Sequence, residues 1–503
     1  MESTEWVQDL PTWSLLLITA AGIGLLLLLV IKARIQPFLA LLIVSIGVAL
    51  AAGIPLAQVL PTIKEGLGNT LGSIAIVVAI GAMLSKVLEE SGGARVLASR
   101  LVRWTGQRRA PLAMGLTGFV FGVPVFFDVG LIILMPLVLG VASRVPALRG
   151  HTLTVALPTA TALMAVHTML PPHPGPVAVA AMFGADLGLV TLWGAGIGLA
   201  AWMVAGYPVG VRIGRRVPLA VPAAHLPADE RVTAPTATAT GGGGTGTDLA
   251  TEGGSGTTDT TDSAATTDTA GPADGRGGAA PAFALVLGII VLPLLLILGN
   301  TLSAAVLPEG DTARTALGFV GDPAVALLIT ALLAFYFLGL RRGTSMSRIE
   351  SMATSAISSA AVVILVTGAG GAFGAVLVAS GVGDALASAL GGLGVPLLVL
   401  GFLVSAALRL SQGSATVAMV TAAGIVGPVV LQQDLSGSAV ALVVIAIGAG
   451  AAAFSHVNDS GFWMVSRLLN MDVATSLRSW TVAVSAMGVA AFVIALLLSL
   501  VVA

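Results

Sequence analysis

The chain has 503 residues, of which 56% are hydrophobic and only 9% are charged, and its mean hydropathy is +1.01. A soluble domain carries roughly 25% charged residues, so this chain could not cover a water-facing surface and we expect it to lie in a lipid bilayer. The net charge of -1 argues against a nucleic-acid partner, which requires a concentrated basic face. The absence of cysteine excludes disulfides and thiolate metal sites.

Apolar stretches long enough to cross a bilayer recur along the whole chain. We expect the first to be a retained transmembrane helix, because acidic residues precede it where a cleaved signal peptide would carry positive charge. Several stretches exceed the length of one crossing, and the same ones contain Gly, Pro or polar interruptions. The stretches lie at residues 12–31, 37–55, 71–90, 110–142, 151–186, 188–211, 281–300, 322–340, 351–380, 395–430, 438–470 and 479–503.

One long connection differs from the rest in composition. It is rich in Gly, Thr, Ala and Asp and contains almost no large apolar side chains. This composition predicts a disordered, cytoplasmic linker between two membrane halves. The predicted organisation is an N-terminal transmembrane helix at residues 1–36, a first transmembrane repeat at 37–212, the linker at 213–280, a linking transmembrane helix and loop at 281–321, and a second repeat at 322–503.

Clusters of Arg and Lys predict the orientation, because positively charged loops stay in the cytoplasm. With every cluster placed inside, the segments 110–142 and 395–430 must each leave and return on the same side. A segment of this length with a break in its middle does so as a re-entrant hairpin, which is tolerated inside protein or beside a cavity. The alternative is that one cluster is misplaced and both segments are plain spans. The clusters are Lys32 and Arg34, Arg95 to Arg109, Arg144 and Arg149, Arg212 to Arg216, Arg341 to Arg348, and Arg467 and Arg478.

An internal repeat supports the hairpins. Residues 81–101 align without gaps to residues 370–390, with nine of 21 positions identical, and the offset is 289 residues (Ser91 to Ser380). The same offset relates the breaks and the apolar stretches beside them. Each half then holds five transmembrane helices and one re-entrant hairpin, and since five is odd the halves lie in opposite orientations. The predicted fold is an all-α polytopic membrane protein of two inverted repeats, an arrangement found in many secondary transporters.

Four interruptions concentrate polar residues. A broken helix exposes unpaired N–H groups with partial positive charge, which bind anions. Neutral donors and acceptors beside them suit a hydroxyl-rich solute, and an acid or histidine within the membrane can carry a proton. The interruptions are residues 122–130 with Asp128, 166–176 with His167 and His173, 407–418 with Arg409, Ser411, Gln412, Ser414 and Thr416, and 455–463 with His456, Asn458, Asp459 and Ser460.

Several of these residues also have a purely structural interpretation. Asp128 is suited to cap the second half of the first hairpin. His167 and His456 are suited to hydrogen-bond carbonyl groups near a break. Arg409 has three roles open to it: it can bind a substrate carboxylate, pair with Asp128 or Asp459, or cap the carbonyls of its own half-helix.

Charged residues and glycines outside the breaks are expected to have structural roles. Lys86, Glu89 and Glu90 are expected to form a mutual or interfacial ion pair, and the stretch Gly368–Gly371 is expected to allow close helix packing. None of the lysines follows a glycine, so no Walker A loop exists, and neither HExxH nor GxSxG occurs. We therefore expect no enzyme activity and no cofactor.

Long runs at the breaks carry a family resemblance. They are residues 72–93, GFVFGVPVFFDVG at 118–130, HTMLPPHPGPVA at 167–178, RLSQGSATVA at 409–418 and HVNDSGFW at 456–463. In these runs the chain resembles the GntP family of gluconate permeases. The resemblance covers most of both halves and omits the linker, which looks like an insertion. It implies a proton-coupled symporter of the ion-transporter superfamily that forms a homodimer and moves a transport domain by an elevator mechanism.

The resulting hypothesis is proton-coupled uptake of gluconate or a related small hydroxy-carboxylate across the cytoplasmic membrane. Other sugar acids and D-serine remain alternative substrates, and a passive facilitator or a membrane-embedded enzyme are the competing classes. The predicted substrate-binding residues are Asp128, His173, Arg409, Ser411, Gln412, Ser414, Thr416, Asn458 and Ser460. The predicted proton-coupling residues are Asp128, His167 and Asp459.

Overall fold

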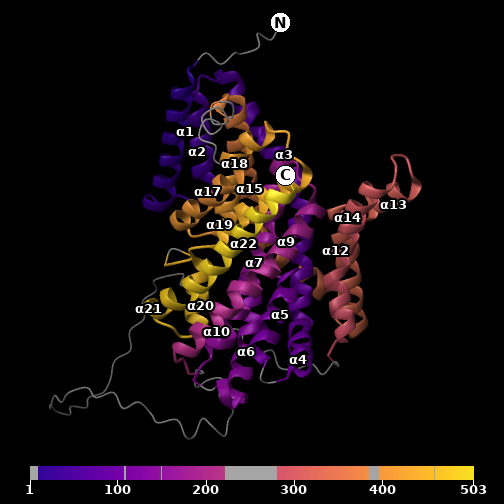
Figure 1. Ribbon diagram of the computed structural model, residues 1–503. Coiled ribbons are helices and arrows are strands. Elements are labelled where there is room, and N and C mark those ends of the chain that lie inside the picture. The colour runs from indigo at the N-terminus through magenta and orange to yellow at the C-terminus, as the bar shows by residue number, and fades with distance from the viewer. Residues whose placement is uncertain are drawn as a thin grey trace, which may run out of the picture.

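The computed structural model describes residues 10–106, 109–148, 150–220, 280–382, 385, 396–457 and 459–502 (Figure 1). Among these, nine helical spans are long and apolar enough to cross a membrane. The prediction of an all-α polytopic membrane protein is therefore confirmed.

The first half runs through a series of helices from α1 to α10. Their bounds are α1 Thr12–Leu27, the π-helical η1 Leu28–Lys32, α2 Pro37–Ala51, α3 Leu56–Glu90, α4 Gly93–Thr105, α5 Ala110–Gly122, α6 Phe127–Arg144, η3 Pro146–Leu148, α7 Leu153–Met169, α8 Pro174–Phe183, α9 Leu187–Ala201, the π-helical η4 Trp202–Gly206 and α10 Tyr207–Arg216. Helix α10 continues past residue 213, where the linker was expected to begin, and residues 221–279 of that expected linker lie outside the described residues.

The second half has the same order of long helices and broken helix pairs as the first. Its elements are α12 Phe283–Val306, α13 Thr312–Val320, α14 Pro323–Ala334, η6 Phe335–Gly339, η7 Leu340–Arg342, α15 Met346–Ala379, α17 Leu397–Gln412, α18 Ala415–Leu431, α19 Gly437–Ala452, α20 Ser460–Leu468, α21 Val473–Ser476, η8 Leu477–Thr481 and α22 Val482–Val502.

Helices α12 and α13 stand at one edge of the molecule (Figure 1).

Helix ends recur near the spacing seen in the sequence repeat. Helices α5 and α17 end at Gly122 and Gln412, and α3 and α15 end at Glu90 and Ala379. In both halves a long helix precedes a pair of helices joined by a break, and a second broken pair follows. Of the aligned segment 370–390, residues 383–384 and 386–390 lie outside the described part of the chain.

Local sequence explains where many helices begin. Proline at the first position and a polar side chain before it start α2, where the Gln36 side chain accepts from the Phe38 N–H, and α14, where Asp322 accepts from the Ala324 N–H. Helix α3 begins at Leu56, well before the apolar run expected at residues 71–90. Its first turns carry polar residues on an exposed face, so hydropathy alone places its start too late.

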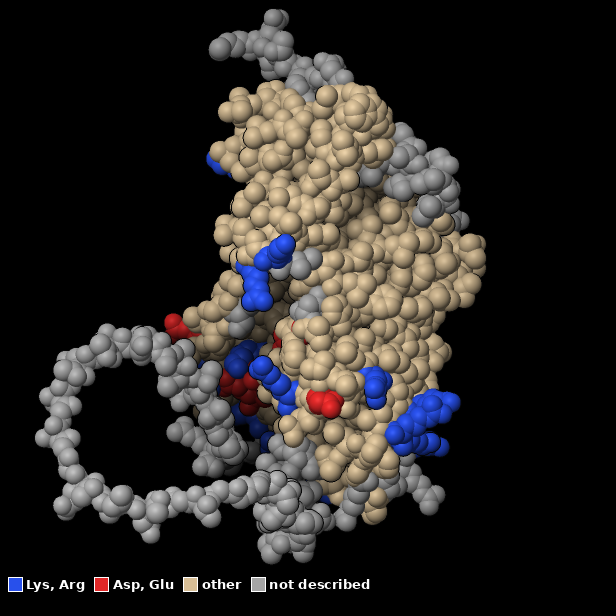
Figure 2. Space-filling model, turned by 90° about the vertical axis from the view of Figure 1, so that its left-hand side faces the viewer, with Lys and Arg blue, Asp and Glu red and all other residues tan. Residues whose placement is uncertain are grey.

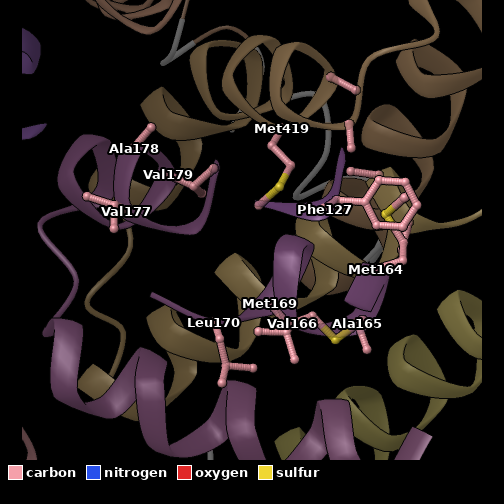
Figure 3. Packing of buried hydrophobic residues seen from close by; sticks show 14 of the residues in the cluster. Phe127, Met164, Ala165, Val166, Met169, Leu170, Val177, Ala178, Val179 and Met419 are labelled. Carbon is pink, nitrogen blue, oxygen red and sulfur yellow. The ribbon is translucent and has the colours of Figure 1, made fainter. Parts of the chain in front are cut away.

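Among the candidate spans, burial is most complete in Leu153–Phe183, which contains α7 and α8. Every residue of α7 except His167 is buried. Close approach depends on glycine: a Cβ on Gly175 of α8 would lie 2.6 Å from the Met419 sulfur of α18. Met419, Phe127 and Val177 are among the buried residues that fill this region (Figure 3). The apolar packing therefore holds α8 and α18, one from each half, directly against each other.

A second glycine contact joins the long helices α3 and α15. A Cβ on Gly66 would lie 2.7 Å from the Gly371 carbonyl oxygen, and a Cβ on Gly371 would collide with the Thr70 side chain. The expectation that the stretch Gly368–Gly371 allows close helix packing is thus confirmed.

Charged residues are unevenly distributed over the surface. On the face shown in Figure 2, Lys, Arg, Asp and Glu gather in the lower part around a hollow, and the upper part is almost free of charge. The expected ion pair of the α3 end is confirmed, since Lys86 Nζ lies 3.1 Å from Glu89 and 3.9 Å from Glu90. Glu90 also accepts from Arg348 of the other half at 2.9 Å.

Candidate functional site

The break between α7 and α8 contacts the break between α5 and α6. His173, which is 2% exposed, stands at the start of α8, and its Nε2 lies 2.7 Å from the carbonyl oxygen of Gly122, the last residue of α5. A carbonyl oxygen can only accept, so Nε2 carries the proton and Nδ1 is left as an acceptor. That Nδ1 is buried and has no hydrogen-bond partner among the described residues.

His167 lies beside His173 on the preceding helix. The two imidazole rings are 5.1 Å apart between centroids and nearly perpendicular, at 74°. Phe127, at the start of α6, lies 6.1 Å from the His167 ring. The buried Nδ1 of His167 also has no partner within the described chain, so no bond to a carbonyl supports the structural alternative for this residue.

Arg409 is the buried cation of the site, with only 1% of its surface exposed. One guanidinium nitrogen donates to Asp459, and the other donates to the carbonyl oxygen of Gly413 at 2.8 Å. Two of the three roles open to Arg409 are therefore present together, the pairing with Asp459 and the capping of its own helix. Its Nε is buried and without a partner in the described part of the chain.

Asp459 collects hydrogen bonds from three sides. It precedes α20 and accepts from the Gly461 N–H at 2.9 Å, which is the geometry of a helix N-cap. Its other carboxylate oxygen accepts from Arg409 and from the hydroxyl of Ser455. The Ser455 hydroxyl in turn accepts from the indole N–H of Trp480, at 2.7 Å.

Asp128 does not cap a helix, so that interpretation was wrong. Helix α6 begins after Phe126, which has no side-chain capping bond, and Asp128 lies one residue inside the first turn. Its side chain is exposed. It lies within electrostatic range of Asp459 and Arg409, so an acid that the protein does not bury faces the buried ion pair.

The remaining predicted residues line the tip of the α17–α18 hairpin and the start of α20. The Gln412 side-chain oxygen is buried with no partner among the described residues, and the Ser414 hydroxyl caps α18 through the Val417 N–H at 3.4 Å. The Ser411 hydroxyl donates to the Ala407 carbonyl at 2.8 Å. Thr416 is half-buried and Ser460 is exposed, and Asn458 lies outside the described residues.

His456 joins the two breaks of the second half. Its Nε2 lies 3.0 Å from the carbonyl oxygen of Leu410, near the end of α17. The interpretation of His456 as a carbonyl-bonding residue is confirmed. Across the halves, the Phe127 and Trp480 rings lie 5.8 Å apart. All four breaks therefore meet in one region.

Sequence reasoning missed two residues of this region, Ser455 and Trp480. Ser455 lies within an interruption that was recognised, but its neighbours carry more distinctive side chains. Trp480 lies 25 residues further on, in the π-helical η8 near the start of the last apolar span. The one available signal was its indole N–H, which needs a partner when buried.

The fold and the site define a class of protein. No group of three or more His, Asp or Glu residues able to hold a metal ion occurs in the described chain. A multi-spanning helical protein whose broken helices meet around polar, partly unpaired groups has the organisation of a secondary transporter.

Comparisons with known proteins place the chain within that class. The model of the GntP family permease matches residues 14–237 and 258–501. The chain belongs to the GntP family of permeases, and the resemblance seen in the sequence is confirmed. Members of this family are transporters and not enzymes.

Individual relatives match over almost their whole length. The inner membrane permease YgbN of Escherichia coli (strain K12) is 40% identical over 96% of this chain and 98% of its own. The high-affinity gluconate transporter of the same strain is 34% identical over 97% and 100%, and its Gnt-II system L-idonate transporter is 33% identical over 93% and 95%.

A solved structure shares the fold. The Alcanivorax borkumensis YdaH transporter, described as having an unusual topology, superposes with a TM-score of 0.59 and covers 93% of this chain and 99% of its own. Its sequence is 14% identical, so this likeness concerns the fold alone.

Proposed function

We propose that the protein takes up a small hydroxy-carboxylate across the cytoplasmic membrane, driven by the proton gradient. The observation that carries the proposal is the meeting of four helix breaks around buried polar atoms that have no partner among the described residues. These atoms are Nδ1 of His167, Nδ1 of His173, the Gln412 side-chain oxygen and Nε of Arg409. Buried polar groups are normally hydrogen-bonded, so their number here favours a ligand or water between the breaks.

The chemistry of these atoms suits a carboxylate with several hydroxyls. Nδ1 of His173 and the Gln412 oxygen accept hydrogen bonds, which hydroxyl groups supply. Nε of Arg409 donates, and the N-terminal end of α18 carries partial positive charge suited to a carboxylate. Gluconate and L-idonate, for which two of the relatives are named, are both carboxylates with several hydroxyls. Gluconate is our first candidate, and another sugar acid or D-serine would make the same kinds of contact.

We propose the following architecture for transport. Each half supplies five crossings and one re-entrant hairpin, α5–α6 in the first and α17–α18 in the second, in opposite orientations. The recurring helix ends and the pairing of α8 with α18 support this arrangement. The transport domain would move by an elevator mechanism within a homodimer, with the linker in the cytoplasm.

Uptake into proteoliposomes tests the function. Purified protein is reconstituted with a pH gradient that is acid outside, and labelled gluconate inside the vesicles is measured over time. The expected result is accumulation above equilibrium that a protonophore abolishes. Equilibration without accumulation would contradict proton coupling and would favour a passive facilitator.

Competition identifies the substrate. Unlabelled gluconate, L-idonate, other sugar acids and D-serine are each added to the gluconate assay. The true substrate class inhibits uptake and drives counterflow of label from preloaded vesicles. Failure of every hydroxy-carboxylate in both assays would contradict the proposed substrate class.

A further inference from the structure

Two tryptophans occupy matching environments and donate to different acceptors. Trp202 lies in the π-helical η4 and Trp480 in the π-helical η8, and both are fully buried. The indole of Trp202 donates to the main-chain oxygen of Pro158 at 2.9 Å. The indole of Trp480 donates to a side chain, the Ser455 hydroxyl, at 2.7 Å. Short π-helical turns are frequent at functional sites, and only Trp480 connects to a charged group.

The indole fixes the direction of the hydrogen bond that Ser455 makes. An indole N–H can only donate, so the Ser455 oxygen accepts from Trp480 and its single proton is free for Asp459. The structure contains that second bond, from the Ser455 hydroxyl to Asp459. The main chain of Ser455 is held by the same helix, because Thr481 Oγ1 donates to its carbonyl at 2.6 Å. Trp480 and Thr481 thus orient one hydroxyl toward one carboxylate.

The donors around Asp459 are complementary to its ionised form. The carboxylate receives the Arg409 guanidinium, the Ser455 hydroxyl and the Gly461 N–H. A protonated Asp459 would have to direct its own O–H toward a group that is already a donor. The ionised carboxylate is also what the buried Arg409 requires, because an unpaired charge in a membrane interior is costly.

Asp128 has the opposite surroundings. It is exposed and has no hydrogen bond or ion pair to the described residues. The charged groups that face it are Arg409 and Asp459. The other titratable groups of the region are His167 and His173 beside the first-half breaks and His456 beside the second-half breaks. Asp128 is therefore the one described carboxylate of the site that can gain and lose a proton without breaking a hydrogen bond.

We propose that Trp480 and Ser455 are positioning residues that keep Asp459 ionised as the partner of Arg409, so that of the two site carboxylates Asp128, and not Asp459, carries the coupled proton. This inference rests on the proposed function. It removes Asp459 from the proton-coupling residues expected from the sequence and gives it a fixed electrostatic role. It also assigns Trp480 and Ser455 a part in proton coupling, although neither residue binds the coupled proton.

The first experiment compares Trp480→Phe and Ser455→Ala with Trp202→Phe in proteoliposomes, using gluconate exchange across a range of pH. The two hydrogen bonds from Trp480 to Ser455 and from Ser455 to Asp459 are called the relay below. Loss of the relay frees Asp459 to take a proton. As the pH is lowered, gluconate exchange by the first two variants should therefore decline about one pH unit closer to neutrality than exchange by the wild type. That shift equals about 1.4 kcal/mol, close to the lower end of what one hydrogen bond to a charged group contributes. Trp202→Phe should keep the wild-type profile. Equal profiles for all variants, or the same shift in Trp202→Phe, would overturn the proposal.

The second experiment follows proton entry with a pH-sensitive dye inside the vesicles. Gluconate entry should bring protons with it in the wild type and in both relay variants, and Asp128→Asn should show residual exchange without acidification. Acidification that persists in Asp128→Asn would assign the proton to another group and refute the inference. Size-exclusion profiles identify misfolded variants, and Ser455→Ala, the smaller change, then decides the test.

Different results would contradict the proposed function and the inference about Trp480 and Ser455. If the wild-type protein neither exchanges nor accumulates any hydroxy-carboxylate, the proposed function is wrong. If the wild type transports and acidifies the vesicles, and the relay variants match it at every pH, only the inference about Trp480 and Ser455 is wrong.

Discussion

Substitution of the buried ion pair between Arg409 and Asp459 measures how strongly the two breaks of the second half are held together. Arg409 is 1% exposed and Asp459 is 2% exposed. Replacing one partner leaves the other charge buried, which costs about 3–5 kcal/mol, whereas replacing both removes the uncompensated charge. The variants are Arg409→Gln, Asp459→Asn and the double substitution.

The single variants are not expected to be equal. In Arg409→Gln the remaining carboxylate keeps the Ser455 hydroxyl, the Gly461 N–H and the positive end of α20. In Asp459→Asn the remaining guanidinium keeps the carbonyl of Gly413. A membrane interior holds an unsatisfied cation poorly, so Asp459→Asn should be the less stable of the two, and the double variant should recover a large part of either loss.

Thermal unfolding in detergent, followed by the fraction of protein that remains monodisperse on size exclusion, ranks the variants. The expected order of midpoints is wild type, double variant, Arg409→Gln and Asp459→Asn. An additive cycle, in which the double variant loses the sum of the two single losses, would refute the reasoning because it would mean that the charges do not interact.

Three further predictions concern turn geometry, helix packing and a surface ion pair. Gly413 has a φ of 75° where α17 ends, so Gly413→Ala should lower the unfolding midpoint through a conformational cost of about 1–2 kcal/mol, and an unchanged midpoint would contradict a strict need for glycine. Gly66→Ala should destabilise the contact of α3 with α15, while Gly68→Ala, where nothing lies within 4 Å of the added Cβ, should be neutral or stabilising; equal midpoints would count against the close contact. Arg348→Ala breaks a half-exposed ion pair with Glu90 and should change stability by no more than about 1 kcal/mol, so a large drop in the same assay would show that this pair does more than cover a surface.

Much of the fold could be predicted from the sequence because the bilayer restricts the choices. Apolar length, Gly and Pro at the breaks and the offset repeat each identify backbone features. Hydropathy failed at α3, where polar residues of the first turns face outward and the helix begins at Leu56. The linker boundary was also placed too early, because α10 ends in arginines that resemble the start of a polar connection.

The site was predictable as a set of segments and less so as a set of roles. Residue type indicated that Arg409 and Asp459 belong to the site, but the choice among three partners for Arg409 depends on distances that spacing does not give. Asp128 was open to a capping role because it lies only two residues after Phe126, which occupies the N-cap position of α6. The Trp480 relay could not be foreseen, since its partner lies 25 residues away across a break.

Several contacts join the two halves of the chain, so a covalent connection between the halves should not be needed for their assembly. The Trp193 indole donates to Ser438 at 3.3 Å, Thr301 donates to Asp186 at 2.8 Å, and Glu90 binds Arg348. With α8 packed on α18 as well, each half is completed by the other. Two separate polypeptides, residues 1–220 and 280–503, should therefore assemble when coexpressed and copurify through a tag on one of them, which would make the protein a natural scaffold for fragment complementation.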